Sequence, residues 1–229
     1  MRNRTRICLL ALVSLEAAFC QQAGNTASPA AASKTGEKGF DYLLSYLNMA
    51  GTKKATAFQP LTQKERNLLY GKSLVNPFWY VKGGLSAGQN QWKDKPAEWE
   101  QGASGYGKRY ADIMGQYAIQ KTTMFGLESL LHEDNRYFGS GKKGFWPRTG
   151  YALKSSILAR HDNGKQYPSV SLVAGYASGA FLSRTWQPPS SNTAGDGAVS
   201  FGISMGWNTG FTVVKEYLPD ILARFTKKH

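Results

Sequence analysis

The chain has 229 residues, a formal net charge of +13 and 13% aromatic residues. This length suffices for one domain with a sizeable core, and the aromatic content excludes a generally disordered chain. Its two cysteines, Cys8 and Cys20, both lie in the first twenty residues. The rest of the chain therefore has no disulfide, no thiolate nucleophile and no cysteine that could bind a metal.

Residues 1–20 are typical of a cleavable signal peptide. A basic start, MRNRTR, precedes the apolar stretch ICLLALVSLEAAF, which is shorter than the roughly 20 residues needed to cross a bilayer. Small residues at Ala18 and Cys20 place the cleavage before Gln21. The alternative is a lipoprotein that keeps an acylated Cys20, although Phe19 stands where a small residue is expected. We predict export to the periplasm or outer envelope, either free or associated with a membrane.

The charge of the exported chain indicates anionic partners. The leader carries three arginines and one glutamate, so the remainder keeps +11. Outside the cytoplasm such a charge favours anionic lipid or an anionic envelope polymer. The basic residues are scattered and no recognition-helix or RNP-type motif accompanies them, so no specific nucleic-acid partner is expected. The oligomeric state is left open.

The first half of the chain predicts a linker and a series of helices. Residues 21–38 are small and polar, as in a disordered linker, and 40–49 have apolar residues at helical spacing. The capping box Thr62-Gln63-Lys64-Glu65 predicts a helix to about residue 70. Asn76-Pro77 predicts another to about residue 92. Residues 93–107 are rich in turn formers, and 108–131 predict the longest helix.

The second half is less regular. We expect a loop over 132–150, a helix or strand over 151–160 and a turn at His161-Asp162-Asn163-Gly164. Two uncharged stretches follow, 166–183 and 197–214, separated by the Pro-rich break 187–192. The second stretch belongs to a segment that runs from 194 to 226.

Small residues recur every four positions in both uncharged stretches, at Gly175 and Gly179 and at Gly202, Gly206 and Gly210. On a helix they would line one face and form a packing seam, where two backbones approach closely. Residues 199–207 also alternate strictly between apolar and small residues, which is typical of a strand of an outer-membrane barrel. Too few segments alternate in this way. We therefore predict a mainly α fold, a single helical bundle over 39–229 with close-packed Gly/Ala/Ser seams, and keep the β-rich outer-membrane barrel as the alternative.

Two polar clusters are the candidates for chemistry. His132, Glu133, Asp134 and Arg136 lie in LLHEDNRYF (130–138), and the pair His161-Asp162 precedes the turn. Histidines and carboxylates can bind metal or transfer protons. Adjacent residues point in different directions, however, and the H-E-x-x-H spacing is absent. We therefore interpret the first cluster as a polar helix end with charge pairs, and keep a metal-dependent or acid/base hydrolase as the alternative.

Other catalytic motifs are missing from the sequence. It contains no G-x-S-x-G nucleophile motif and no G-K-[ST] phosphate loop with the required spacing. We accordingly predict no cofactor and no metal site, and we assign no catalytic residue.

Several phrases occur together in a fixed order: EWEQGASGYGKRYAD (98–112), LLHEDNRYF, GFWPRTGYALKS (144–155), AGDGAVSFGISMGWNTGF (194–211) and VVKEYLPDI (213–221). In this combination the chain resembles an uncharacterised family of exported bacterial proteins. The resemblance implies one exported, helical domain and no known activity. Relatives usually have Asp-Pro-Arg-Tyr where this chain has 134–137, with Asn135 in place of the proline. They also have Phe-Trp-Pro-Asp where this chain has Tyr217-Leu218-Pro219-Asp220.

These observations favour a non-enzymatic protein of the cell envelope that associates with a membrane or with other anionic envelope components. A hydrolase that uses the polar clusters and an outer-membrane barrel are the alternatives.

Overall fold

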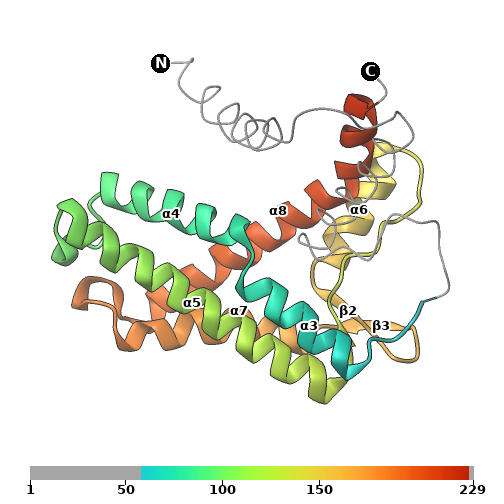
Figure 1. Cartoon of the computed structure of the whole chain (residues 1–229), viewed down its shortest axis with the longest axis horizontal. Helices are drawn as coiled ribbons and strands as arrows, with labels where there is room; N and C mark the ends of the chain where they lie inside the picture. The colour runs from blue at the N-terminus through green and yellow to red at the C-terminus, as the bar shows by residue number, and fades with distance from the viewer. Residues whose placement is uncertain (1–57, 227–229) are drawn as a thin grey trace, which may run out of the picture. The chain divides into compact units, whose positions relative to one another are not determined.

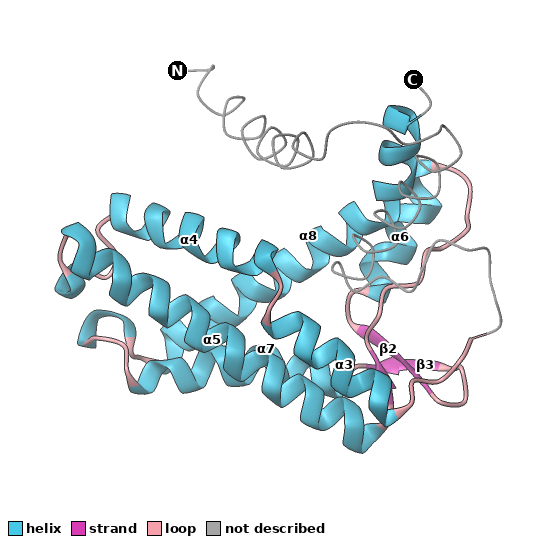
Figure 2. Cartoon of the chain, viewed as in Figure 1, coloured by secondary structure: helices cyan, strands magenta, loops and turns pink. Residues whose placement is uncertain are grey.

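A computed structural model describes the backbone of residues 58–226 and the side chains of 58–221. The predicted signal peptide, linker and helix over 40–49 lie outside the described residues. Of the described residues 73% are helical and 6% are in strands (Figure 2). The predicted mainly α fold is therefore confirmed.

The six α-helices of the described region are joined by a small sheet and short 3-10 turns (Figure 1). The helices are α3 (Gln63–Leu74), α4 (Pro77–Trp92), α5 (Gly102–Leu131), α6 (Phe145–Ser155), α7 (Val170–Leu182) and α8 (Ala194–Thr226). The strands are β1 (Glu133–Asp134), β2 (Leu158–His161) and β3 (Gln166–Pro168), and the 3-10 turns are η1 (Ala97–Trp99), η2 (Ser183–Thr185) and η3 (Pro189–Ser191).

Helices α3 and α4 begin at the predicted caps. The Thr62 hydroxyl accepts the backbone N–H of Glu65, and the Glu65 carboxylate accepts the backbone N–H of Thr62 at 2.8 Å. The Asn76 side chain accepts the N–H of Phe78, with Pro77 at the first helical position. These local bonds satisfy backbone donors that a helix start leaves open, so the sequence predicted both starts correctly.

Helix α5 starts at residue 102, six residues before the predicted start at 108, so part of the expected turn region is helical. The buried Arg109 explains this difference. Its guanidinium donates to the carbonyl oxygens of Lys95 at 2.9 Å and Pro96 at 2.8 Å, and to that of Glu100 at 2.6 Å. One side chain thereby holds the α4–α5 connection against the first turns of α5, which helical propensity alone does not predict.

The predicted loop over 132–150 is only partly correct, because this segment also contains regular structure. β1 lies at their start, and α6 begins within them at Phe145. β1 pairs antiparallel with β2, and β2 pairs antiparallel with β3, in the order β1-β2-β3. The predicted turn at 161–164 lies in the connection between β2 and β3, with Gly164 at φ +75°. The tertiary pairing of three very short strands decides this region, since none of them carries a clear period of its own.

Helices α7 and α8 contain the two uncharged stretches. Ser169 caps α7 by accepting the N–H of Leu172, and Thr193 caps α8 by accepting the N–H of Asp196. Residues 199–207 therefore belong to a helix although their apolar residues alternate. No helix of the described region combines the length and the apolar character that crossing a membrane requires.

α5 packs against α3, α4 and α7, while α8 packs against α7 and α6. The glycines predicted to form seams divide into two groups. A Cβ added to Gly179 would lie 2.8 Å from the carbonyl oxygen of Gln116, and one added to Gly175 would lie 3.0 Å from that of Gln120, so both glycines face the α5 backbone at close range. Gly202, Gly206 and Gly210 differ from the expectation. An added Cβ there meets no described atom within 4 Å, because this face of α8 is open.

The two groups of glycines predict opposite effects of alanine. Gly179→Ala should lower the free energy of unfolding by roughly 1–3 kcal/mol, because the Gln116 backbone cannot move aside without separating α5 from α7. Gly206→Ala should leave the free energy of unfolding unchanged or raise it by up to about 1 kcal/mol, since alanine favours helix and nothing blocks its methyl group. Urea denaturation of both variants measures this. Equal destabilisation by both would contradict the assignment of the seam to α7 alone.

Candidate functional site

The structure places the predicted polar cluster at the junction of α5, the sheet and α7, and there Glu133 holds the start of α7. Its buried carboxylate accepts the backbone N–H groups of Val170 at 3.0 Å and Ser171 at 2.9 Å, and the hydroxyls of Ser169 and Ser171. Burial raises the pKa of Glu133, but the bonds from Ser171, Val170 and Ser169 outweigh it and the net pKa lies below its usual value. A carboxylate at a helix N-terminus also meets the positive end of the helix dipole.

The other members of the cluster are also paired. The buried carboxylate of Asp134 accepts hydrogen bonds from two nitrogens of Arg136, Nε at 3.0 Å and Nη2 at 2.7 Å. His132 ends α5 in the left-handed conformation at φ +54°, and its Nδ1 lies 2.9 Å from the carboxylate of Asp162. The His161 ring packs edge-on against Tyr167 at 5.2 Å between centroids.

The strand pairing brings the two predicted clusters together without making them converge. Glu133 lies opposite His161, and Asp134 opposite Arg160. Neighbouring side chains on a strand point to opposite faces, so the two carboxylates face apart. Within residues 58–221 no group of three or more His, Cys, Asp or Glu side chains is placed to hold a metal ion. The contacts agree with charge pairs at a helix end.

A second buried carboxylate, Glu216, ties α8 to α6 and to the segment after β1. It accepts the Tyr137 hydroxyl at 2.5 Å, the Ser140 backbone N–H at 3.0 Å and Nε of Arg148 at 2.9 Å. Arg148 also pairs with Asp220, one turn further along α8. Three of the sequence phrases, around 137, 148 and 216, thus meet in one hydrogen-bond network.

The buried carboxylates make stability dependent on acid pH. The pKa of Glu133 is lowered in the folded chain, so its contribution is present above the unfolded value near 4.5 and is lost as the pH falls through the folded value. Glu133→Gln should lower the free energy of unfolding by roughly 1–3 kcal/mol at pH 7. The difference in free energy of unfolding between this variant and the unmodified chain should narrow below pH 4.5 in urea titrations. The exposed Glu100→Gln is the matched control, and an equal loss in that variant would overturn the role of Glu133.

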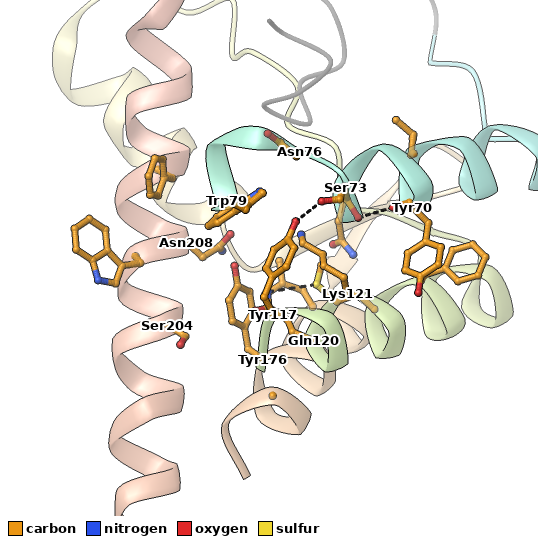
Figure 3. A pocket seen from close by; sticks show the side chains of 18 of the residues that line it. Tyr70, Ser73, Asn76, Trp79, Tyr117, Gln120, Lys121, Tyr176, Ser204 and Asn208 are labelled. Carbon is orange, nitrogen blue, oxygen red and sulfur yellow. Dashed lines mark hydrogen bonds between the residues drawn. The ribbon is translucent and has the colours of Figure 1, made fainter. Parts of the chain in front are cut away.

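A cavity of about 290 Å³ lies between α4 and α8, and residues of α3, α5 and α7 line it as well. This volume is close to the lower end of the roughly 300–1,000 Å³ typical of small-molecule sites. Figure 3 shows Tyr117, Gln120 and Lys121 of α5 beside Trp79 of α4 and Asn208 of α8. Phe78 of α4 meets Phe211 of α8 edge-on at 5.7 Å, and this contact joins the two walls.

Four lysines line this cavity: Lys72 of α3, Lys82 of α4, Lys121 of α5 and Lys215 of α8. We call the last three the cavity lysines. None of them forms an ion pair or hydrogen bond with the described part of the chain. The Nζ atoms of Lys82 and Lys121 instead lie near aromatic rings. Lys82 is 4.6 Å from the ring centre of Trp79, and Lys121 is 5.7 Å from that of Tyr117. Such cation–π contacts stabilise an ammonium group only partly.

The cavity lysines carry perturbed pKa values because they are removed from bulk water and lie near one another. Burial lowers the pKa of Lys82 and of Lys215, and the charge of Lys121 lowers both further. The pKa of Lys215 falls to about 8. Burial lowers the pKa of Lys121 as well, against a smaller opposing effect of Glu128. Glu128 itself has a raised pKa, mainly from burial.

Neutral polar groups, aromatic rings and the charged side chains of Arg66, Glu128, Asp134 and Arg136 complete the lining. Tyr117 donates to the Ser73 carbonyl at 2.7 Å (Figure 3). Asn208 donates to the Ser156 carbonyl at 2.8 Å, so both side chains are held in place. The Trp79 ring stacks on Tyr117 at 5.2 Å. A recess with three unpaired ammonium groups and aromatic walls can bind an anionic group that has an apolar portion.

No sequence motif marks these lysines as a site. Lys82, Lys121 and Lys215 are separated by 39 and 94 positions and belong to no motif. One signal was present: each is the only lysine in a long, largely uncharged helical stretch, at 77–92, 109–127 and 197–215. Neither a family model, nor a curated protein, nor a solved structure matches this chain.

Lys215 makes stability depend on alkaline pH in a defined direction. The pKa of Lys215 is near 10.5 in the unfolded chain and about 8 in the folded chain. Between these values the unfolded chain holds the additional proton, so the contribution of this group to stability rises with pH. Lys215→Met should therefore raise the free energy of unfolding at pH 7 by roughly 1–3 kcal/mol, and the gain should shrink between pH 8 and 10.5. Urea unfolding across this range tests it, with the exposed Lys64→Met as control. A loss of stability in Lys215→Met would contradict this electrostatic account.

Proposed function

We propose that this chain is a non-enzymatic binding protein of the cell envelope, which captures an anionic group in the cavity between α4 and α8. The observation that carries the proposal is the set of three lysines that face one cavity without a partner. The anion belongs to a membrane lipid headgroup or to another acidic component of the envelope. The predicted signal peptide and the charge of +11 after its removal support this location.

The contrast with the other buried charges supports the proposal. Arg109 and Glu133 are each saturated by hydrogen bonds from within the chain. Burying a charge without a partner is costly, and proteins rarely retain such a group where it has no role. A bound anion would supply the missing partner to Lys82, Lys121 and Lys215 together.

The engagement of most of the candidate catalytic groups favours binding over hydrolysis. Glu133 caps α7, Asp134 holds Arg136, and His132 pairs with Asp162. We also propose that the chain belongs to the uncharacterised exported family that it resembles. Its shared phrases supply the buried arginines and carboxylates that hold the cavity walls, among them Arg109, Glu133 and Glu216.

Inorganic pyrophosphate is a simple probe of the cavity. The full-length chain should bind it in calorimetry, with a change in tryptophan fluorescence because Trp79 lies under Lys82. The affinity should fall as the pH rises through about 8, where Lys215 loses its proton, and should fall with added salt. Lys121→Met should weaken binding roughly tenfold or more, the usual effect of deleting one charged hydrogen-bond partner.

The exposed Lys64→Met provides the matched control, because it removes the same charge from α3 outside the cavity. Lys215→Met separates binding from folding, since it should lose affinity while gaining stability. Unchanged affinity in both Lys121→Met and Lys215→Met would refute the assignment of the cavity as the anion site.

A further inference from the structure

The face of α8 beside the cavity is apolar and open. At 100° per residue, Ser204, Asn208, Phe211 and Lys215 line the cavity, and the adjoining face carries Val199, Ile203, Trp207, Gly210 and Val214. Val199, Ile203, Trp207 and Val214 are 52–62% exposed. Trp207 belongs to both faces, because it also lines the cavity. We call this second set the α8 strip; it contains no charged residue.

The opposite wall repeats the arrangement. Lys82 and Ser86 of α4 line the cavity, while Val81, Leu85 and Trp92 are 49%, 55% and 88% exposed. These three residues form the α4 strip. They lie on the side of α4 turned away from Gly83, which packs against Met114 of α5. Lysines inside a cavity are thus bordered on two sides by exposed, uncharged apolar strips.

We propose that the occupant is a single anionic lipid, with its phosphate among Lys82, Lys121 and Lys215 and its acyl chains along the α8 and α4 strips. This inference rests on the proposed function and names the ligand class. From Val199 to Val214 the α8 strip extends about 22 Å, which is long enough to accompany an acyl chain through the roughly 15 Å depth of one leaflet of hydrocarbon. The charge of the headgroup matches the cavity, and the chains match the strips that border it.

An anionic polymer fits this surface less well. It carries charge along its whole length and would need cations along the exposed surface. Here the three cavity lysines are recessed, and the exposed residues of the two strips that border them carry no charge. The separation of a charged recess from apolar borders suits a molecule whose charge is confined to one end.

The test compares a lipid with its headgroup, using the full-length chain. Dihexanoyl phosphatidic acid, kept monomeric, and glycerol 3-phosphate carry the same phosphate and differ in the acyl chains. Each buried methylene strengthens binding roughly fourfold, so the lipid should bind more than roughly tenfold tighter. The double variant Ile203→Ser, Val214→Ser should lose at least about fivefold for the lipid and nothing for glycerol 3-phosphate. Leu130→Ser, which removes a leucine 75% exposed on α5, should change neither affinity.

The outcomes separate the two proposals. Equal affinity for the two ligands, or a double variant that binds the lipid normally, would overturn the lipid assignment while pyrophosphate binding leaves the proposed function standing. Tighter binding of polyphosphate than of the lipid, compared per phosphate, would assign the cavity to a polymer. Loss of both ligands in the double variant, with an unchanged unfolding midpoint, would place the strip residues in the anion site and also overturn the lipid assignment. If neither pyrophosphate nor lipid binds, both proposals fail together.

Discussion

A charge removed from water must be compensated, and the architecture of this chain follows from how that requirement is met. The buried apolar side chains of the described region are mostly small, including Ala87, Ala152, Ala159 and Ala180. Buried charges supply much of the specific contact between elements. Arg109 holds the α4–α5 connection, Glu133 the start of α7, and Glu216 the contact of α8 with α6. Each is surrounded by donors or acceptors that only the folded chain assembles.

These contacts also set the walls of the cavity. Glu133 fixes where α7 begins, and close approach at Gly175 and Gly179 fixes its spacing from α5. Glu216 and its partner Arg148 fix the C-terminal half of α8. The helices that carry Lys121 and Lys215 are therefore positioned by charges that are themselves satisfied. In the proposed function, one set of charged groups stabilises the fold and a different set, the cavity lysines, binds the ligand.

The cavity lysines depart from this rule of compensation. Their pKa values are lowered by burial, and Lys121 lowers those of Lys82 and Lys215 further, which means that keeping them charged opposes folding. Cation–π contacts with Trp79 and Tyr117 offset part of this opposition. A residue that costs stability and faces a cavity is more readily explained by binding than by folding. The open strips of α4 and α8 extend the same reasoning to the apolar portion of a ligand.

Local chemistry made parts of the fold predictable. The capping box at Thr62, the Asn76-Pro77 start and the glycines at 175 and 179 act through neighbouring residues or a single helix face, so the sequence determined those helix starts and the mainly α class. The earlier start of α5 and the helical state of 199–207 depended on Arg109 and on packing against α7. The cavity depended on tertiary structure altogether, because Lys82, Lys121 and Lys215 are far apart in sequence and become neighbours only when three helices pack. Sequence determined which segments are helical; tertiary structure decided which charges are compensated, because compensation requires partners distant along the chain.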